Sequence, residues 1–313
     1  ITVGNTLNKT LTYQENDTII DIKGERGLNL IFDKRKGGLS SFRYEGFDYL
    51  KSSLVPDFWR VNTDNDDWDS ENNVWKNAIS KMQVLQVTVE PATAVSKKEK
   101  KYEQIKVHVK TQFTVSEKPQ HTIFFDTDYT VHADGSIRVD NYFTPNYYNG
   151  ESNMSIPRIG QVVNMNSELS LAQWYGRGPW ENYSDRKTSA LVGEYEMPVS
   201  ELPYNYIRPQ ENGYRTDVRW LKLKSPDGHA LKITGEPIFC FNIQFTGQDG
   251  YFTNDGARMR SSVNMVKEQN YYLNIDYAQK GVGGDNSWGK PVHSEYLVLL
   301  RYHAYSFWLQ PEL

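Results

Sequence analysis

The sequence predicts an all-β protein, built as one large antiparallel domain in which many strands form a sandwich. Apolar and polar residues alternate with a period of two over residues 82–90, 102–115, 121–131 and 136–145, as in strands with one buried face. Aromatic residues make up 13% of the chain against 38% hydrophobic residues overall, so rings should supply much of the core. No linker or repeat divides the chain, and we expect residues 1–313 to form a single domain.

The strands continue to the end of the chain, with one helix expected among them. Asp134-Gly135 predicts a tight hairpin, because a type I′ turn needs positive φ at both central positions. Residues 257–269 follow a cap-like Asn254-Asp255 pair and have the best helical periodicity, so we expect a helix there. Residues 44–53 form either a mobile flap or a plain hairpin end. Later strand-like segments read HALKITGE, IFCFNIQF, YYLNIDYAQ and EYLVLLRYHAYSFWLQ.

The charge pattern excludes several classes of function. The formal net charge is -4 and both signs are interspersed, so we expect binding to neither nucleic acid nor an anionic membrane. The strongest basic run, at residues 97–101, is expected to be a solvated turn. No apolar run approaches the roughly 18 residues of a membrane span, which favours a soluble protein, cytoplasmic or periplasmic.

Cysteine and histidine usage points to no cofactor or metal site in this chain. Cys240 is the single cysteine, can form no internal disulfide, and is expected to be a small buried hydrophobe. The six histidines lack the spacing of metal ligands. The chain opens without methionine and without a signal-like segment, so a processed product and a piece of a larger chain both stay open.

Polar loops rich in rings, arginines and carboxylates occur at residues 58–68, 173–190 and 206–220. Such side chains either line a cleft or hold loops together. Within the first loop, TDNDD at 63–67 lacks the spaced acceptors and distal glutamate of a calcium loop. We expect a turn with Asx hydrogen bonds there, and we take Asp64 and Asn65 as candidates for a loop network or second shell.

A fourth stretch, GVGGDNSWGKP at residues 281–291, sets an aromatic ring among glycines and small polar residues. A dinucleotide-binding loop is excluded, because proline and glycine follow where a helix should open. The flat face of Trp288 beside Asp285, Asn286 and Ser287 suits a sugar, which has an apolar face and a rim of hydroxyls. A bulged loop whose tryptophan fills the core is an equal alternative.

Taken together, these stretches resemble the C-terminal small-chain domain of family 2 β-galactosidases. YGRGPWENYSDR, then PQENGYR, then LNID followed by GVGGDNSW, occur in the order and approximate spacing of that family, and FDKRKGGLSSFRYEGFDYL and FWRVNTDND fit its N-terminal part. The resemblance implies a galactose-mutarotase-like supersandwich at the end of a multidomain glycosidase, which is commonly oligomeric. It implies that catalytic glutamates lie on a separate (β/α)8 barrel and that Trp288 faces the galactoside.

The residues agree that the catalytic pair lies elsewhere. Family 2 acid/base glutamates follow an asparagine, and the chain contains no Asn-Glu dipeptide. We expect Arg177, Arg186 and Arg215 to pair with Glu181, Asp185 and Glu211, and so to fix loop shapes. Asn182 and Asn212 belong to the same network or second shell. An independent carbohydrate-binding module and an aldose mutarotase-like enzyme stay open as alternatives.

Overall fold

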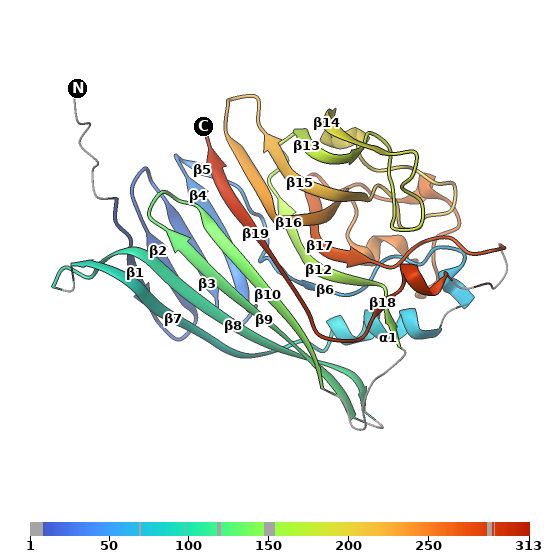
Figure 1. Ribbon diagram of the computed structural model, residues 1–313, viewed down its shortest axis with the longest axis horizontal. Coiled ribbons are helices and arrows are strands. Elements are labelled where there is room, and N and C mark those ends of the chain that lie inside the picture. Colours follow the sequence, from blue (N-terminus) through green and yellow to red (C-terminus); the bar gives the residue numbers. More distant parts are fainter. Residues whose placement is uncertain are drawn as a thin grey trace.

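The computed structural model describes residues 9–68, 70–96, 98–117, 120–146, 154–286, 290 and 292–313. Within these residues the chain folds into two curved antiparallel sheets and a short strand pair (Figure 1). The predicted all-β antiparallel architecture is therefore confirmed. Among the described residues no helix is long and apolar enough to cross a membrane.

The smaller sheet has five strands in sequence order within the described part of the chain. They are β1 (Thr12–Glu15), β2 (Ile19–Lys23), β3 (Asn29–Asp33), β4 (Gly38–Tyr44) and β5 (Phe47–Asp48). The 44–53 segment contains the end of the β4–β5 hairpin, in which Tyr44 pairs with Phe47. Of the two alternatives for this segment, the hairpin end is the one observed.

The larger sheet has twelve strands in the described residues, with a main path β14-β13-β15-β16-β19-β10-β9-β8-β7 and a branch in which β12 joins β17 and β6. Its strands are β6 (Val55–Asp57), β7 (Gln83–Ser96), β8 (Lys101–Glu117), β9 (Gln120–His132), β10 (Ile137–Asn146), β12 (Arg158–Met165), β13 (Leu171–Gly178), β14 (Leu191–Pro198), β15 (Arg215–Lys224), β16 (Ala230–Gln244), β17 (Tyr271–Gln279) and β19 (His303–Glu312). The separate pair is β11 (Ser155–Ile156) with β18 (Val298–Leu299).

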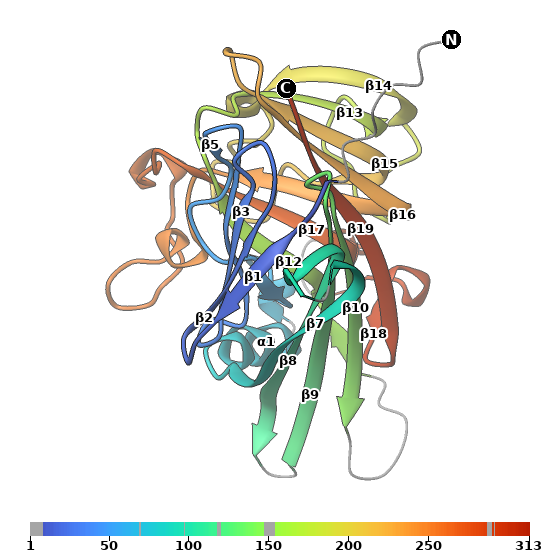
Figure 2. The same cartoon turned by 90° about the vertical axis from the view of Figure 1, so that its left-hand side faces the viewer.

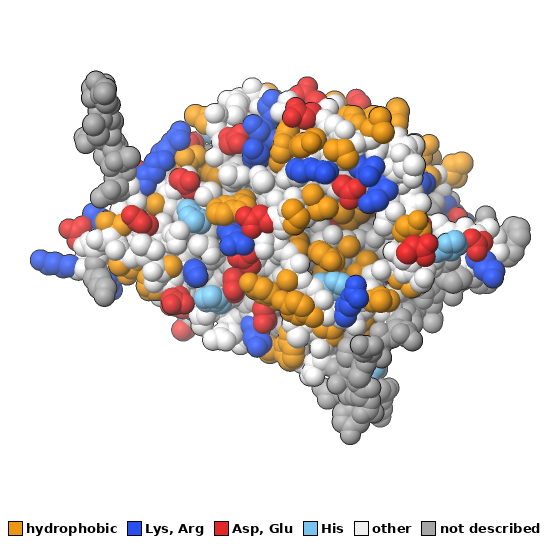
Figure 3. Space-filling view, viewed as in Figure 1, with side chains coloured by type: hydrophobic (Ala, Val, Ile, Leu, Met, Phe, Trp, Pro, Cys, Tyr) orange, Lys and Arg blue, Asp and Glu red, His pale blue; other side chains and the backbone are white. Residues whose placement is uncertain are grey.

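One hydrophobic core joins the two sheets. Figures 1 and 2 show the five-stranded sheet lying against the β7–β10 part of the larger one. Across this junction the rings of Phe32 and Tyr129 meet edge to face, with centroids 5.0 Å apart. Further along, Phe58 packs against Phe113 and Phe125, with centroids 4.8 and 5.6 Å away. Outside this core, the face in Figure 3 mixes acidic and basic side chains, as the sequence predicts.

The Asp134-Gly135 hairpin joins β9 to β10 as predicted, but its turn type differs. Gly135 has φ of +92°, whereas Asp134 is not among the residues with positive φ. Asp134 Oδ1 instead accepts hydrogen bonds from the Ser136 amide at 2.9 Å and the Ser136 hydroxyl at 2.6 Å. The connection is thus a longer loop closed by an aspartate, not a two-residue type I′ turn.

The predicted helix at 257–269 is wrong. That segment contains only the 3-10 turn η4 (Ser262–Asn264), and Val263 is 88% exposed. The α-helix is α1 (Ser70–Ile79), in which Trp75 is fully buried and packs edge to face against Phe58. A short helix is marginal in water unless one face is buried, and α1 buries Trp75 and Ala78 completely. Other 3-10 turns are η1 (Asp66–Trp68), η2 (Val199–Glu201), η3 (Gln248–Tyr251) and η5 (Ser294–Tyr296).

Two smaller predictions can be placed on the fold. Residues 98–100 form the expected exposed turn, while Lys97 lies outside the described residues. Cys240 is partly buried in β16, and burial raises the pKa of its thiol to about 12, with the Tyr214 hydroxyl beside it. The thiol is therefore protonated at neutral pH and chemically quiet.

Candidate functional site

A pocket of about 250 Å³ opens where the four stretches singled out in the sequence meet. The loops that form it gather at the right-hand end of the molecule in Figure 1. Side chains from residues 58–68, 173–190, 206–220 and 281–286 line its wall, although these segments are far apart in the chain. The lining residues are Thr63, Asp64, Asn65, Tyr183, Arg186, Tyr206, Gln210, Glu211 and Val282. We call this cavity the loop pocket.

The first loop is anchored by a buried ion pair between Arg60 and Asp66. Both carboxylate oxygens of Asp66 lie 3.0 Å from guanidinium nitrogens. Burial opposes ionisation of Asp66, but Arg60 and Lys280 outweigh it and hold the pKa of the carboxyl below its usual range. The same guanidinium donates to the Gly281 carbonyl at 2.7 Å. Arg60 thereby ties the first loop to the glycine-rich one, and the sequence reasoning missed it.

The expected turn at 63–67 is present. The Thr63 amide donates to Asp66 Oδ2 at 3.0 Å, and the Asp66 amide donates to Thr63 Oγ1 at 3.2 Å. This reciprocal pair resembles a helix cap and precedes η1. Asp64 is not bonded within the turn. Arg208 and Arg258 donate to it, at 2.6 and 2.9 Å.

The second loop is fixed by Glu181 and Asn182. Glu181 accepts hydrogen bonds from Arg186, from the Tyr206 hydroxyl and, at 2.7 Å, from the Gly213 amide. Asn182 is fully buried, and its Oδ1 accepts from the Thr216 amide at 3.0 Å. These contacts join residues 173–190 to residues 206–220. The Glu181–Arg186 pair is one the sequence predicts.

Asp185 explains two of the glycines of the fourth stretch, Gly281 and Gly283. Its carboxylate accepts hydrogen bonds from the amides of Val282 and Gly283, at 3.1 and 2.6 Å. A Cβ on Gly281 would lie 2.6 Å from Asp185 Oδ2, and a Cβ on Gly283 would lie 3.0 Å from it. The Asp185 carboxylate therefore packs directly against this backbone. Only glycine, which lacks a Cβ, leaves enough space for it.

Beyond this clamp the fourth loop carries exposed polar side chains. The Asp285 carboxylate lies 2.7 Å from His293 Nε2, and this hydrogen bond raises the pKa of the imidazole. Asn286 Oδ1 accepts from the Lys290 amide at 3.2 Å. Ser287 and Trp288, the other two residues expected to bind sugar, lie outside the described residues.

Two of the three predicted arginine pairings are wrong. Arg177 pairs with Asp217, at 2.5 Å, because the two side chains lie on adjacent strands β13 and β15. Arg215 contacts main-chain carbonyls, including those of Leu202 at 2.7 Å and Gly213 at 2.6 Å. Burial without a bonded carboxylate lowers the pKa of Arg215 to about 10.

Glu211 and Asn212 have other partners, which lie deeper in the sheet. Asn212 Oδ1 accepts from the Tyr204 amide at 2.9 Å and from Gln244 Nε2 at 3.0 Å. Glu211 reaches Arg158, which lies at the start of β12 and was not a candidate from the sequence. The Glu211 side chain thus connects the loop pocket to the interior.

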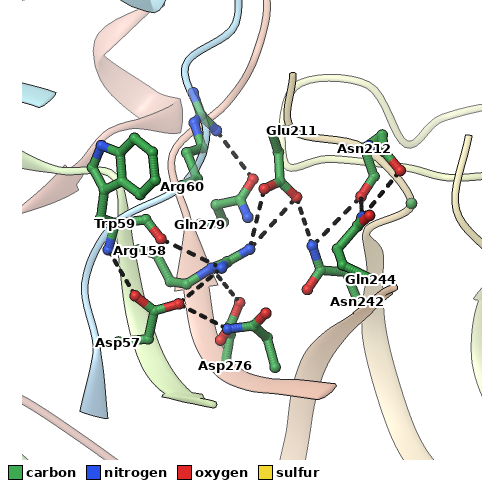
Figure 4. Close-up of polar contacts among 12 residues, drawn as sticks. Asp57, Trp59, Arg60, Arg158, Glu211, Asn212, Asn242, Gln244, Asp276 and Gln279 are labelled. Carbon is green, nitrogen blue, oxygen red and sulfur yellow. Dashed lines mark hydrogen bonds and ion pairs between the residues drawn. The ribbon is translucent and has the colours of Figure 1, made fainter. Parts of the chain in front are cut away.

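Arg158 lies at the centre of three carboxylates in the interior (Figure 4). Its guanidinium nitrogens lie 3.1 Å from Asp57, 3.3 Å from Glu211 and 3.0 Å from Asp276, and all four side chains are buried. Burial raises the pKa of Asp276 well above its usual value, with Arg158 opposing this shift. Burial likewise raises the pKa of Glu211 against the pull of Arg158. We call these four residues the Arg158 cluster.

The described residues contain no group of three or more histidine, cysteine or acidic side chains arranged to hold a metal ion. The carboxylates around the loop pocket accept hydrogen bonds from arginines and main-chain amides. Their contacts join one loop to the next. The loop pocket is therefore a polar surface whose loops are held in place by hydrogen bonds and by the buried residues beneath them.

The family model described as "Beta galactosidase small chain" matches residues 24–309. The chain belongs to this small-chain family. This small chain is 30% identical to the β-galactosidase of Priestia megaterium over 96% of its length, and 30% identical to that of Halalkalibacterium halodurans over 90%. It spans about a quarter of these relatives, 27% and 26% of their lengths. Among solved structures, the galactose 1-epimerase of Lactobacillus acidophilus aligns at a TM-score of 0.47 with 9% identity, covering 97% of the small chain and 98% of the epimerase.

Large apolar side chains are exposed on two neighbouring loops of the small chain. Ile207 is 85% exposed and Val266 is 76% exposed, and the Ser262 amide donates to the Ile207 carbonyl at 2.9 Å. Trp180, beside Glu181, is 68% exposed. Exposed apolar side chains on neighbouring loops are typical of surfaces that contact another domain.

Proposed function

We propose that this chain is the non-catalytic, C-terminal part of a β-galactosidase, and that it completes one wall of the pocket for the terminal β-galactoside. The observation that carries the proposal is the convergence of four loops, with Asp185 clamping the backbone of residues 282–283. This clamp fixes the backbone from which residues 284–286 continue. Asp285, Asn286, Ser287 and Trp288 would then supply hydrogen-bonding groups and an aromatic face to the sugar, while the catalytic carboxylates belong to the remainder of the parent enzyme.

The partner of this wall would be the other domains of the parent, chiefly its (β/α)8 barrel. Two observations support a contact at this end of the molecule. Curated relatives are roughly four times as long as the matched region. Ile207, which follows the loop-pocket residue Tyr206, exposes apolar area, as do Val263 and Val266 on the neighbouring segment that Ser262 joins to it. Burying such area against a second domain is favourable, at about 25 cal/mol per Å².

The test uses the intact parent enzyme and a chromogenic β-galactoside. Asp185→Ala removes the acceptor that holds the Val282 and Gly283 amides. We expect the Michaelis constant to rise about tenfold, equivalent to roughly 1.4 kcal/mol, with a smaller change in kcat, because ground-state positioning is lost. Trp288→Ala should act in the same direction.

The matched control is Asp227→Ala, an exposed aspartate in the turn between β15 and β16. It should leave both kinetic constants unchanged. Unaltered Michaelis constants in both Asp185→Ala and Trp288→Ala, with the fold intact by circular dichroism, would reject the proposed wall.

A further inference from the structure

A second and larger cavity, of about 610 Å³, lies on the other side of the Glu211 side chain. Its walls come from β6, β12, β16 and β17, from the end of α1, and from the turn η3. A volume in the range of roughly 300–1,000 Å³ is typical of small-molecule sites. Glu211 lines both cavities, whereas the other loop-pocket residues do not line this one. We call it the sheet cavity.

The floor of the sheet cavity is polar and rigid. Asp57, which is buried, accepts hydrogen bonds from Arg158 at 3.1 Å, Gln248 Nε2 at 3.1 Å and Asn274 Nδ2 at 2.9 Å. These three donors come from β12, η3 and β17. The floor is therefore held by contacts across several elements, as a preformed binding surface requires.

One buried polar atom on this floor lacks a hydrogen-bond partner among the described residues. Asn242 is 1% exposed and lines the cavity, and its Nδ2 donates to Glu211 Oε1 at 2.8 Å. This bond turns Oδ1 to the opposite side of the amide, as Figure 4 shows. Asn242 Oδ1 has no hydrogen-bond partner among the described residues. A buried acceptor left unpaired is costly, so the site favours a ligand that brings a donor such as a hydroxyl.

The charges around the cavity favour a neutral ligand. Lys76 lines the cavity, but its Nζ lies 3.3 Å from the Phe252 ring centroid and is held there by a cation–π contact. Asp249 and Glu268 line the same cavity and carry negative charge, opposite to that of Lys76. An anion would meet these carboxylates, and a cation would meet Lys76 and the arginines.

The walls also offer apolar faces. The rings of Tyr251 and Tyr272 line the cavity together with Ile79 and Val162. The Tyr272 hydroxyl is held by Glu268, at 2.9 Å from Oε2, which fixes its ring. Fixed rings beside buried amides match a molecule with C–H faces and several hydroxyls.

We propose that the sheet cavity is a second binding site, specific for a neutral, monosaccharide-sized polyhydroxylated ligand whose hydroxyl donates to Asn242 Oδ1. This site is separate from the proposed galactoside wall and does not depend on it. The residues described as lining the cavity all belong to this chain.

The experiment is calorimetric titration of the 313-residue chain with D-galactose, D-glucose and inorganic phosphate. We expect saturable binding of a neutral sugar at one site and no binding of phosphate. Asn242→Leu keeps the approximate side-chain shape but removes both the acceptor and the amide donor to Glu211, and it should weaken sugar binding by about tenfold. Tyr272→Ala should weaken it as well, and this half-exposed position gives a folded variant if Asn242→Leu does not fold.

Two controls separate this site from the loop pocket. Tyr302→Ala removes an exposed tyrosine elsewhere and should leave sugar binding unchanged. Asp185→Ala loosens the loop pocket, so it distinguishes a sugar held there from one held in the sheet cavity. The proposal is overturned if neither sugar binds, if phosphate binds instead, or if sugar affinity survives in Asn242→Leu and Tyr272→Ala. Loss of binding in Asp185→Ala would overturn it too, because the sugar would then occupy the loop pocket. The kinetic test of the galactoside wall in the parent enzyme is independent of every one of these results.

Discussion

The guanidinium of Arg158 balances carboxylates that reach it from three distant segments. Asp57, Glu211 and Asp276 lie in the β6 strand, in a loop and in β17, and each is buried. Removing one partner of a buried ion pair leaves charge unpaired in a medium of low polarity, which is much more damaging than losing a surface pair. Sequence reasoning identified Glu211 but not Arg158, because nothing local distinguishes an arginine at the start of a strand.

We expect Arg158→Met to lower the free energy of unfolding by about 3–5 kcal/mol at neutral pH. The loss should shrink as the pH falls to about 5. The pKa values of Asp276 and Glu211 are already raised in the folded state, and they rise further without the cation. A carboxyl with a raised folded-state pKa stabilises the fold at low pH and loses that contribution as the pH rises through the raised pKa. Urea unfolding at both pH values measures the effect.

Arg177→Met is the matched control for this pH dependence. Arg177 and its partner Asp217 are partly exposed, and the pKa of Asp217 is lowered: burial opposes this shift, but hydrogen bonds from Arg177 and Lys187 outweigh it. The Asp217 carboxyl therefore stays ionised at pH values below its usual pKa. Arg177→Met should lower the free energy of unfolding by the same amount at neutral pH and at about pH 5. Equal pH dependence in the two variants would contradict the role assigned to the Arg158 cluster.

At the scale of the elements, alternation of apolar and polar residues predicted the strands well and the helix poorly. Strand periodicity is local, and β8, β9 and β10 occur where the alternation is clear. The helix depends on a surface to bury against. Trp75, Ala78 and Ile79 have helical spacing and pack into the core in α1, and this was the signal that could have found it. Residues 257–269 have similar spacing, but Val263 and Val266 are exposed and Met265 packs only partly against the core.

The bulge in β12 makes an element-level prediction. Gly160 faces Asp276 across the β12–β17 pair, next to a register shift, and a Cβ there would lie 1.9 Å from Asp276 Oδ1. Gly160→Ala should therefore displace Asp276 from Arg158 and lower stability by about 1–3 kcal/mol. Urea unfolding measures the loss.

Gly193→Ala, on the edge strand β14, is the control for that substitution. Its Cβ would come no closer than 3.3 Å, to the Tyr195 ring. The change should stay within about 0.5 kcal/mol. If Gly160→Ala and Gly193→Ala lower the free energy of unfolding equally, the close approach to Asp276 is not the reason for glycine at position 160.

At the scale of the whole molecule, the two sheets share one hydrophobic core. Residues from β2, β3 and β4 belong to the same buried cluster as residues from β8, β9 and β19. A shared core couples the unfolding of both sheets, because neither keeps its buried face when the other is lost. The single domain that the sequence predicts stays a prediction, and it requires this coupling.

Phe32→Ala tests that coupling. Phe32 lies in the small sheet and packs against Tyr129 of the large one. The substitution should cost about 3–5 kcal/mol and shift one common unfolding transition, followed by calorimetry and by circular dichroism. Two separate transitions, of which only one shifts, would mean that the sheets unfold as separate domains.

The sequence by itself determined the family, the antiparallel β-architecture and the four stretches that meet at the loop pocket. These follow from local patterns and from motifs read in order along the chain. Only the tertiary structure decided which side chains are partners. Arg60 bonds with Gln279, 219 residues away, and Arg158 with Asp57, 101 residues away. The physical reason is that such pairs depend on strand register and on the packing of one sheet against another, which no local pattern encodes. The sheet cavity, enclosed by four strands and two helical turns, could be found only after those contacts were known.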